Sequence, residues 1–269
     1  MITDWDDAYA NGAYIPGADE YVANWELSAS DYKITMNKAG RALLNQSYGP
    51  HPREAMEIFL PEGESKGLVV FVHGGYWRSR DRDLWLHLAA GSVARGWTVA
   101  MPGYVLCPEV RIADITRSIA SAIEFAANKV NGPIHLAGHS AGGHLVARMG
   151  CEDVQLTCAD RIKRIVSISG VHDLRPMLKT EMNEDFQLTP STAVAESPAL
   201  LAPDPDLNIV CWVGADERPE FVRQNALLAN IWAGFGIDVQ NVEEDGHNHF
   251  SVIESLAFPN GALTEALVG

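Results

Sequence analysis

The run GHSAG at residues 138–142 places Ser140 between two glycines, after the apolar run 133–137 and before the helix-forming run 141–149. A serine on so tight a strand-to-helix turn is pushed clear of the sheet, and only glycines fit beside it. The amide of Ala141 begins the helix, where positive partial charge can stabilise an oxyanion. A glycine-rich turn with a helix-capping serine has the same letters, but the strand-helix context favours Ser140 as a nucleophile.

A second glycine-containing loop, HGGYW at residues 73–77, directly follows the apolar run 68–72. Acyl transfer needs two backbone N–H groups directed at the developing oxyanion, and glycines let the backbone come close to the substrate. Gly75 and Tyr76 are the preferred donors, and Gly74 shapes the loop. A simple turn between strand and helix would also explain the glycines, but not a second match to the same chemistry.

A serine hydroxyl needs a base to take its proton, and nine histidines compete for that role. Local hydrogen bonding is the expected role of the histidines that adjoin the two motifs, which are His73, His135, His139 and His144; His51, His87 and His172 lie too early or on other elements. The chain order nucleophile, acid, histidine then leaves His247 and His249, which follow the last predicted strand. The acid must lie between Ser140 and these histidines. Asp216 is preferred because it ends the penultimate predicted strand, with Glu217 and Asp173 as rivals. Its role would be to fix the imidazole tautomer and stabilise the imidazolium.

Short apolar runs alternate with helical patterns through most of the chain, which predicts an α/β fold with a mainly parallel sheet and helices on both faces. Reactive residues then belong at the carboxyl ends of the strands. We expect one domain, residues 1–269, with residues 1–50 as an arm of short helices. The predicted strands are 68–72, 97–101, 133–137, 162–168, 209–213 and 237–242; the predicted helices are 84–95, 112–130, 141–149, 220–233 and one near the C-terminus.

Composition limits the remaining classes. The formal net charge is −15, and the sequence has no visible cluster of Lys and Arg. Both observations disfavour binding to nucleic acid. No run approaches the ~20 apolar residues that would span a membrane, and the acidic first residues do not resemble a signal peptide. Four cysteines stand without metal-ligand spacing, so we expect reduced thiols, no metal and a cytoplasmic location.

With these motifs in place, the chain resembles the kynurenine formamidase (arylformamidase) branch of the α/β-hydrolases. The similarity lies in HGGYW, in GHSAGGH at 138–144, in SGVHDLRP at 169–176, in DERPEF at 216–221 and in HFSVIE at 249–254. The run YVLCPE at 104–109 is similar to a segment of hormone-sensitive-lipase-like esterases. In this family a histidine followed by phenylalanine near the C-terminus is the base, which favours His249 over His247. Val105 and Ser251 depart from the family pattern.

The resemblance implies two-step acyl transfer at Ser140 on a small carboxylic ester or aryl formamide, with N-formylkynurenine as the specific candidate and no cofactor. Tyr76, Trp77 and Tyr104 are expected to form an aromatic pocket. The alternatives are a broad short-chain carboxylesterase and a non-catalytic binding protein on a hydrolase scaffold; a thioesterase has no support beyond shared chemistry. The N-terminal arm could act as a lid or complete the core, and a homodimer is one expected assembly.

Overall fold

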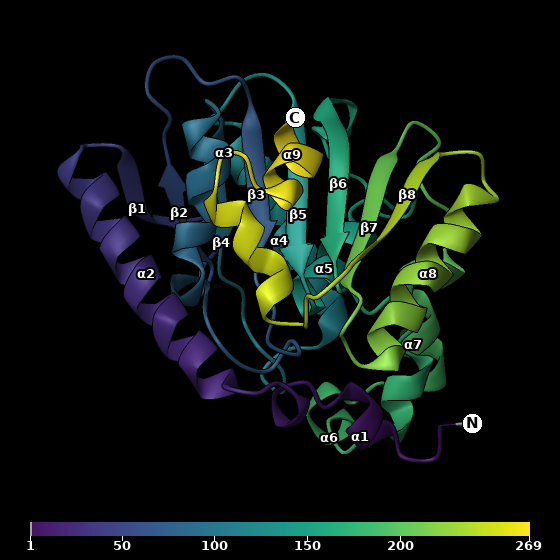
Figure 1. Ribbon diagram of the computed structural model, residues 1–269. Helices are drawn as coiled ribbons and strands as arrows, with labels where there is room; N and C mark the ends of the chain where they lie inside the picture. Colours follow the sequence, from purple (N-terminus) through teal and green to yellow (C-terminus); the bar gives the residue numbers. More distant parts are fainter. Residues whose placement is uncertain (1) are drawn as a thin grey trace.

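The computed structural model describes residues 2–269, which build an eight-stranded sheet with helices on both faces (Figure 1). The strand order is β1-β2-β4-β3-β5-β6-β7-β8. β2 pairs antiparallel with β1 and β4, and all other pairs are parallel, so the predicted mainly parallel α/β-hydrolase sheet is confirmed. The strands are β1 (Ala42–Ser47), β2 (Ala55–Phe59), β3 (Leu68–Val72), β4 (Thr98–Pro102), β5 (Ile134–His139), β6 (Ile162–Ile168), β7 (Asn208–Gly214) and β8 (Asp238–Glu244).

Two buried clusters, one on each face of the sheet, hold the helices in place. Side chains alternate along β3: Leu68 and Val70 join the cluster under α4, α5 and α8, whereas Val69 and Phe71 join the cluster under α2, α3 and α9. Figure 1 shows α3 and α9 on one side of the strands and α4 and α5 on the other. The helices are α1 (Trp5–Tyr9), α2 (Ala18–Lys38), α3 (Ala90–Ala94), α4 (Ile112–Ala127), α5 (Ala141–Arg148), α6 (Asn183–Phe186), α7 (Pro190–Ala195), α8 (Pro219–Ala233) and α9 (Ala262–Val268).

The N-terminal region differs from the expected arm of short helices. It contains α2, a helix of 21 residues, and then β1, which is an edge strand of the sheet. Trp25 of α2 is buried in the core cluster of that face. The arm is also bonded to the residue that precedes α8, because Arg218 donates to the carbonyl oxygen of Asp7 at 3.0 Å. The arm therefore completes the core.

The predicted helix over 84–95 is divided in the structure. Two 3-10 turns, Arg82–Leu84 and Leu86–Ala89, precede the short helix α3. The first two strands are absent from the sequence prediction: β1 alternates between half-buried and exposed residues, and β2 contains the fully buried carboxylate Glu57. A carboxylate within the run hides its strand character, because buried acidic residues are rare unless paired. Glu57 is paired with Lys33 at 3.1 Å.

Candidate active site

Ser140 lies on the turn between β5 and α5 with φ 57° and ψ −117°, a conformation that non-glycine residues rarely adopt. Its amide donates to the carbonyl of Ile168 on the neighbouring strand at 2.8 Å, which fixes the turn. A Cβ on Gly138 would lie 2.2 Å from the carbonyl oxygen of Gly142, and one on Gly142 would lie 2.0 Å from that of Val72. Both glycines are therefore required by close backbone contacts.

The loop after β3 has three consecutive residues with positive φ: Gly75 at 111°, Tyr76 at 50° and Trp77 at 54°. The amide of Ser79 donates to the carbonyl of Gly75 at 2.9 Å and closes the turn. A Cβ on Gly75 would lie 2.2 Å from the Ser79 carbonyl oxygen, so this position also requires glycine. Strained backbone of this kind is typical of functional sites.

This loop meets the serine turn at Gly74, where an added Cβ would lie 3.1 Å from the Cβ of Ser140. Within residues 2–269, no acceptor receives the amide hydrogens of Gly75, Tyr76 or Ala141. Free amides beside a serine are the arrangement that can bind an oxyanion. The predicted donors Gly75, Tyr76 and Ala141, and Gly74, the residue predicted to shape the loop, therefore lie on two turns that meet at Ser140.

His249 is buried, and its Nδ1 lies 2.5 Å from Oε2 of Glu217. The other oxygen of this carboxylate accepts hydrogen bonds from the Ser169 hydroxyl at 2.5 Å and the Gly214 amide at 2.9 Å. A carboxylate that receives donors on both oxygens is held in one orientation. Because it can only accept while ionised, it fixes the proton of His249 on Nδ1 and leaves Nε2 free.

The structure corrects the choice of acid: Glu217, named as a rival, takes the position expected for Asp216. Asp216 is exposed, and the carboxylate that bonds His249 belongs to Glu217. Asp173, the other rival, forms an ion pair with Arg175 at 2.8 Å, and hydrogen bonding to Arg175 lowers the pKa of its carboxyl despite burial. Because β7 ends at Gly214, the backbone forms a turn over residues 215–217, and one residue of difference within this turn separates the exposed Asp216 from the buried Glu217.

Ser140 and His249 line one cavity of about 240 Å³, whereas His247 is not among its lining residues. The arm contributes to its walls, so it covers the site as well as completing the core. Burial raises the pKa of the Tyr76 phenol to about 12, and its hydroxyl donates to the carbonyl of Tyr9 at 2.6 Å. The lining residues are Asn11, Gly12, Val22, Trp25, Gly75, Tyr76, Ser79, Arg80, Trp85, His139, Ser140, His249 and Phe250.

Two predicted pocket residues lie elsewhere. Trp77 packs beneath the loop, with its indole N–H donating to Nδ1 of His144 at 3.2 Å. Tyr104 stacks on the His73 ring at 4.3 Å between centroids and donates its hydroxyl to the His73 carbonyl at 2.9 Å. Neither lines the cavity, so both support the loop from below. The aromatic walls instead come from Trp25, Trp85 and Phe250 together with Tyr76; the sequence offers no local motif for these distant positions.

His139 connects the serine turn to the loop of His249. Its Nε2 donates to the carbonyl oxygen of His249 at 2.9 Å, and the two rings lie 4.6 Å apart. Burial, together with the nearby His249, holds the pKa of His139 well below its usual value, so its imidazole is neutral. The local hydrogen-bonding role expected for His139 thus joins the two halves of the site.

Other features of the described chain bear on cofactors and membranes. Within residues 2–269 there is no group of three His, Cys, Asp or Glu side chains that could hold a metal ion. All four cysteines are buried and free. No helix in this part of the chain has both the length and the apolar character to cross a membrane.

Comparison with known proteins places these features in a family. The BD-FAE family model matches residues 56–207. The chain is 31% identical over 264 residues to the kynurenine formamidase of Salmo salar, covering 93% of this chain and 89% of that one. It is 30% identical over 240 residues to the kynurenine formamidase of Danio rerio, covering 85% and 81%.

Solved structures agree in fold. A crystal structure from Silicibacter sp. TM1040, provisionally described as a thioesterase, is 47% identical with a TM-score of 0.94 and 99% coverage of both chains. Esterase B from Lactobacillus rhamnosis shares the fold at 14% identity and a TM-score of 0.65, covering 91% of this chain and 92% of that one. The chain belongs to the BD-FAE family and is an arylformamidase-like hydrolase with the α/β-hydrolase fold.

Proposed function

We propose that this hydrolase is a serine enzyme in which Ser140 attacks a carbonyl carbon, His249 is the base and Glu217 orients it. The observation that carries the proposal is the buried His249–Glu217 contact of 2.5 Å, with His249 in the same cavity as a serine on a strained turn. A serine hydroxyl is activated by a histidine base whose ring is oriented by a carboxylate.

The proposed reaction has two steps. His249 takes the hydroxyl proton of Ser140 as the oxygen bonds to the carbonyl carbon, and the amides of Ala141 and of Gly75 or Tyr76 stabilise the oxyanion. The imidazolium, facing the Glu217 carboxylate, then gives this proton to the leaving alcohol or amine as the acyl-enzyme forms. Water, deprotonated by the same histidine, releases the acid in the second step.

The proposed substrates are small carboxylic esters or aryl formamides, with N-formylkynurenine as the leading candidate. The kynurenine formamidase relatives support it at the level of sequence. The cavity supports it at the level of shape, because about 240 Å³ with several aromatic walls suits one small aromatic molecule. The provisional description of the 47% identical structure makes a thioesterase the second candidate.

One comparison separates these candidates: kcat/KM of the purified protein on N-formylkynurenine, 4-nitrophenyl acetate and S-phenyl thioacetate. A formamidase is expected to cleave the formamide at least as efficiently as the esters, and Ser140→Ala is the control for all three reactions. Turnover of the ester with no formamide cleavage would contradict the formamidase assignment and leave a carboxylesterase. A clear preference for the thioester would favour the second candidate instead.

A further inference from the structure

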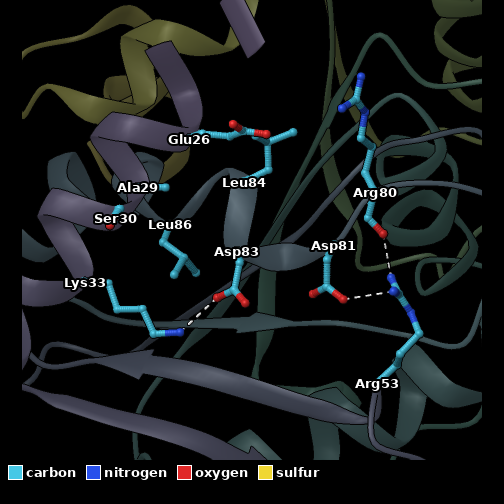
Figure 2. Close-up of a pocket in the computed structure, with 10 residues that line it drawn as sticks. All are labelled: Glu26, Ala29, Ser30, Lys33, Arg53, Arg80, Asp81, Asp83, Leu84 and Leu86. Atoms are coloured by element: carbon cyan, nitrogen blue, oxygen red, sulfur yellow. Dashed lines mark hydrogen bonds and ion pairs between the residues drawn. The ribbon is translucent and has the colours of Figure 1, made fainter. Parts of the chain in front are cut away.

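Arg80 lines two neighbouring cavities. Unlike Lys33 and Arg53, the other cations of these cavities, it forms no ion pair among residues 2–269. One cavity is the site that holds Ser140; the other has a volume of about 550 Å³ and is drawn in Figure 2. Two opposite-charge pairs line the larger cavity, because Lys33 bonds Asp83 at 3.0 Å and Arg53 bonds Asp81 at 2.9 Å, and Glu26 adds one further negative charge. Apart from Arg80, the larger cavity therefore offers an anionic ligand no unpaired cation among its lining residues.

The guanidinium of Arg80 has no protein partner among residues 2–269. Each of the other arginines in that range donates from its guanidinium to a carbonyl, a carboxylate or an amide oxygen. Figure 2 shows the guanidinium of Arg80 extended away from Asp81 and Asp83, although both carboxylates are nearby in sequence. Five N–H donors of one side chain thus remain available to a ligand.

The backbone of Arg80 is held firmly while its side chain is free. Its φ of 72° lies in the left-handed region, which a non-glycine residue adopts only where its surroundings hold it there. Arg53 donates from Nη2 to the Arg80 carbonyl at 2.6 Å and from Nε to the Tyr104 carbonyl at 2.8 Å. The adjacent Ser79 closes the turn on Gly75, so Arg80 ends the same rigid loop that supplies the free amides.

The cavity around Ser140 has aromatic walls and a single full charge. Among residues 2–269, no Asp or Glu lines it, and Arg80 is the only Lys or Arg that does. This is unusual in a chain of net charge −15, where a random surface patch is expected to be acidic. Aromatic walls beside one unpaired guanidinium fit a ligand with a flat apolar ring and an anionic group.

We propose that Arg80 is a specificity-determining residue that binds a carboxylate on the leaving group of the substrate. The proposal rests on the proposed hydrolase function and deepens it. A formyl or acetyl group has no room for an additional charge, so the anion must lie on the alcohol or amine that departs. The guanidinium holds the carboxylate through paired N–H donors while Ser140 attacks the carbonyl carbon.

The first test compares 4-carboxyphenyl acetate with phenyl acetate. The ratio of kcat/KM for these esters is measured for the wild type, Arg80→Gln, Arg80→Lys and Arg78→Gln, which cancels the intrinsic reactivity difference of the two leaving groups. Arg80→Gln is expected to lower the ratio about tenfold, the size of a partly exposed charge-assisted contact. Arg80→Lys should restore part of it, because lysine keeps the charge without the planar fork.

Arg78→Gln is the matched control, since Arg78 stands two residues earlier, forms an ion pair with Asp185 at 2.7 Å and does not line the cavity. It is expected to leave the ratio within about twofold of the wild-type value, because a rim charge outside the cavity acts weakly. An unchanged ratio in Arg80→Gln, or an equal loss in Arg78→Gln, would overturn the proposal.

The second test measures binding without turnover. It therefore distinguishes failure of the proposed hydrolase function from failure of the anion site. Calorimetry measures the affinity of wild type and Arg80→Gln for 4-hydroxybenzoate and for neutral 4-hydroxybenzamide. The wild type is expected to prefer the anion, with a preference that weakens as salt increases and disappears in Arg80→Gln. If no ester is cleaved but this preference is present, the anion site stands and the hydrolase assignment fails. Equal affinities in the wild type would refute the anion site.

Discussion

Replacement of Glu217 by glutamine tests how His249 is oriented. The carboxylate oxygen Oε1 receives two donors, from Ser169 and Gly214, so the glutamine carbonyl oxygen is expected to take this position. Its NH₂ group then faces Nδ1 of His249 in place of an acceptor. The histidine must present a lone pair at Nδ1 and carry its proton on Nε2, where it can no longer accept the proton of Ser140.

This wrong tautomer sets the size of the expected effect. Glu217→Gln should lower kcat for 4-nitrophenyl acetate by about a thousand- to ten-thousand-fold, with little change in the thermal midpoint because the local hydrogen bonds remain. The loss corresponds to roughly 4 to 5.5 kcal/mol of activation free energy. The matched control is Asp216→Asn, one residue earlier and exposed, which should stay within about twofold. A large loss in Asp216→Asn with an active Glu217→Gln would refute the assignment.

Three further results are expected. Gly142→Ala should lower the free energy of unfolding by about 3 kcal/mol, since its Cβ would lie 2.0 Å from the Val72 carbonyl oxygen; an unchanged urea midpoint would contradict the tight turn. Burial lowers the pKa of His144 from 6.5 to about 3, so between these pH values the unfolded chain binds a proton that the folded chain does not bind. The free energy of unfolding should therefore fall as the pH drops below about 6.5. His144→Gln should reduce that slope by up to ~1.4 kcal/mol per pH unit in urea titrations at pH 7 and pH 5; an identical slope would assign the loss to other groups. His139→Asn should lower kcat about tenfold with KM nearly unchanged, because the hydrogen bond to the His249 carbonyl positions the base; an unaltered kcat would leave His139 a purely structural residue.

The fold could be predicted where local sequence dominates. Strands β3 to β7 contain continuous or nearly continuous apolar runs, and the glycines around Ser140 mark its turn in the sequence. β1 and β2 could not be recognised in this way. β1 is an edge strand with exposed alternate residues, and β2 contains Glu57, whose burial depends on pairing with Lys33, 24 positions earlier.

The site was predictable to the extent that short motifs define it. The loop 73–77 and the serine turn come together because their strands, β3 and β5, are parallel neighbours. The distinction between Asp216 and Glu217 depends on the path of the backbone after Gly214, which no pattern in the sequence reports. Trp77 and Tyr104 are near the motifs in sequence but point below the loop, whereas the cavity takes Trp25 from a helix more than a hundred residues before Ser140.

The central claim is that Ser140 forms the covalent intermediate, and trapping with an organophosphate tests it most directly. The protein is treated with diisopropyl fluorophosphate, and intact mass and peptide mapping are compared with residual hydrolysis of 4-nitrophenyl acetate. We expect one adduct per chain, on Ser140, formed in proportion to the activity lost and absent from Ser140→Ala. An adduct at another residue, or full activity in Ser140→Ala, would contradict the account.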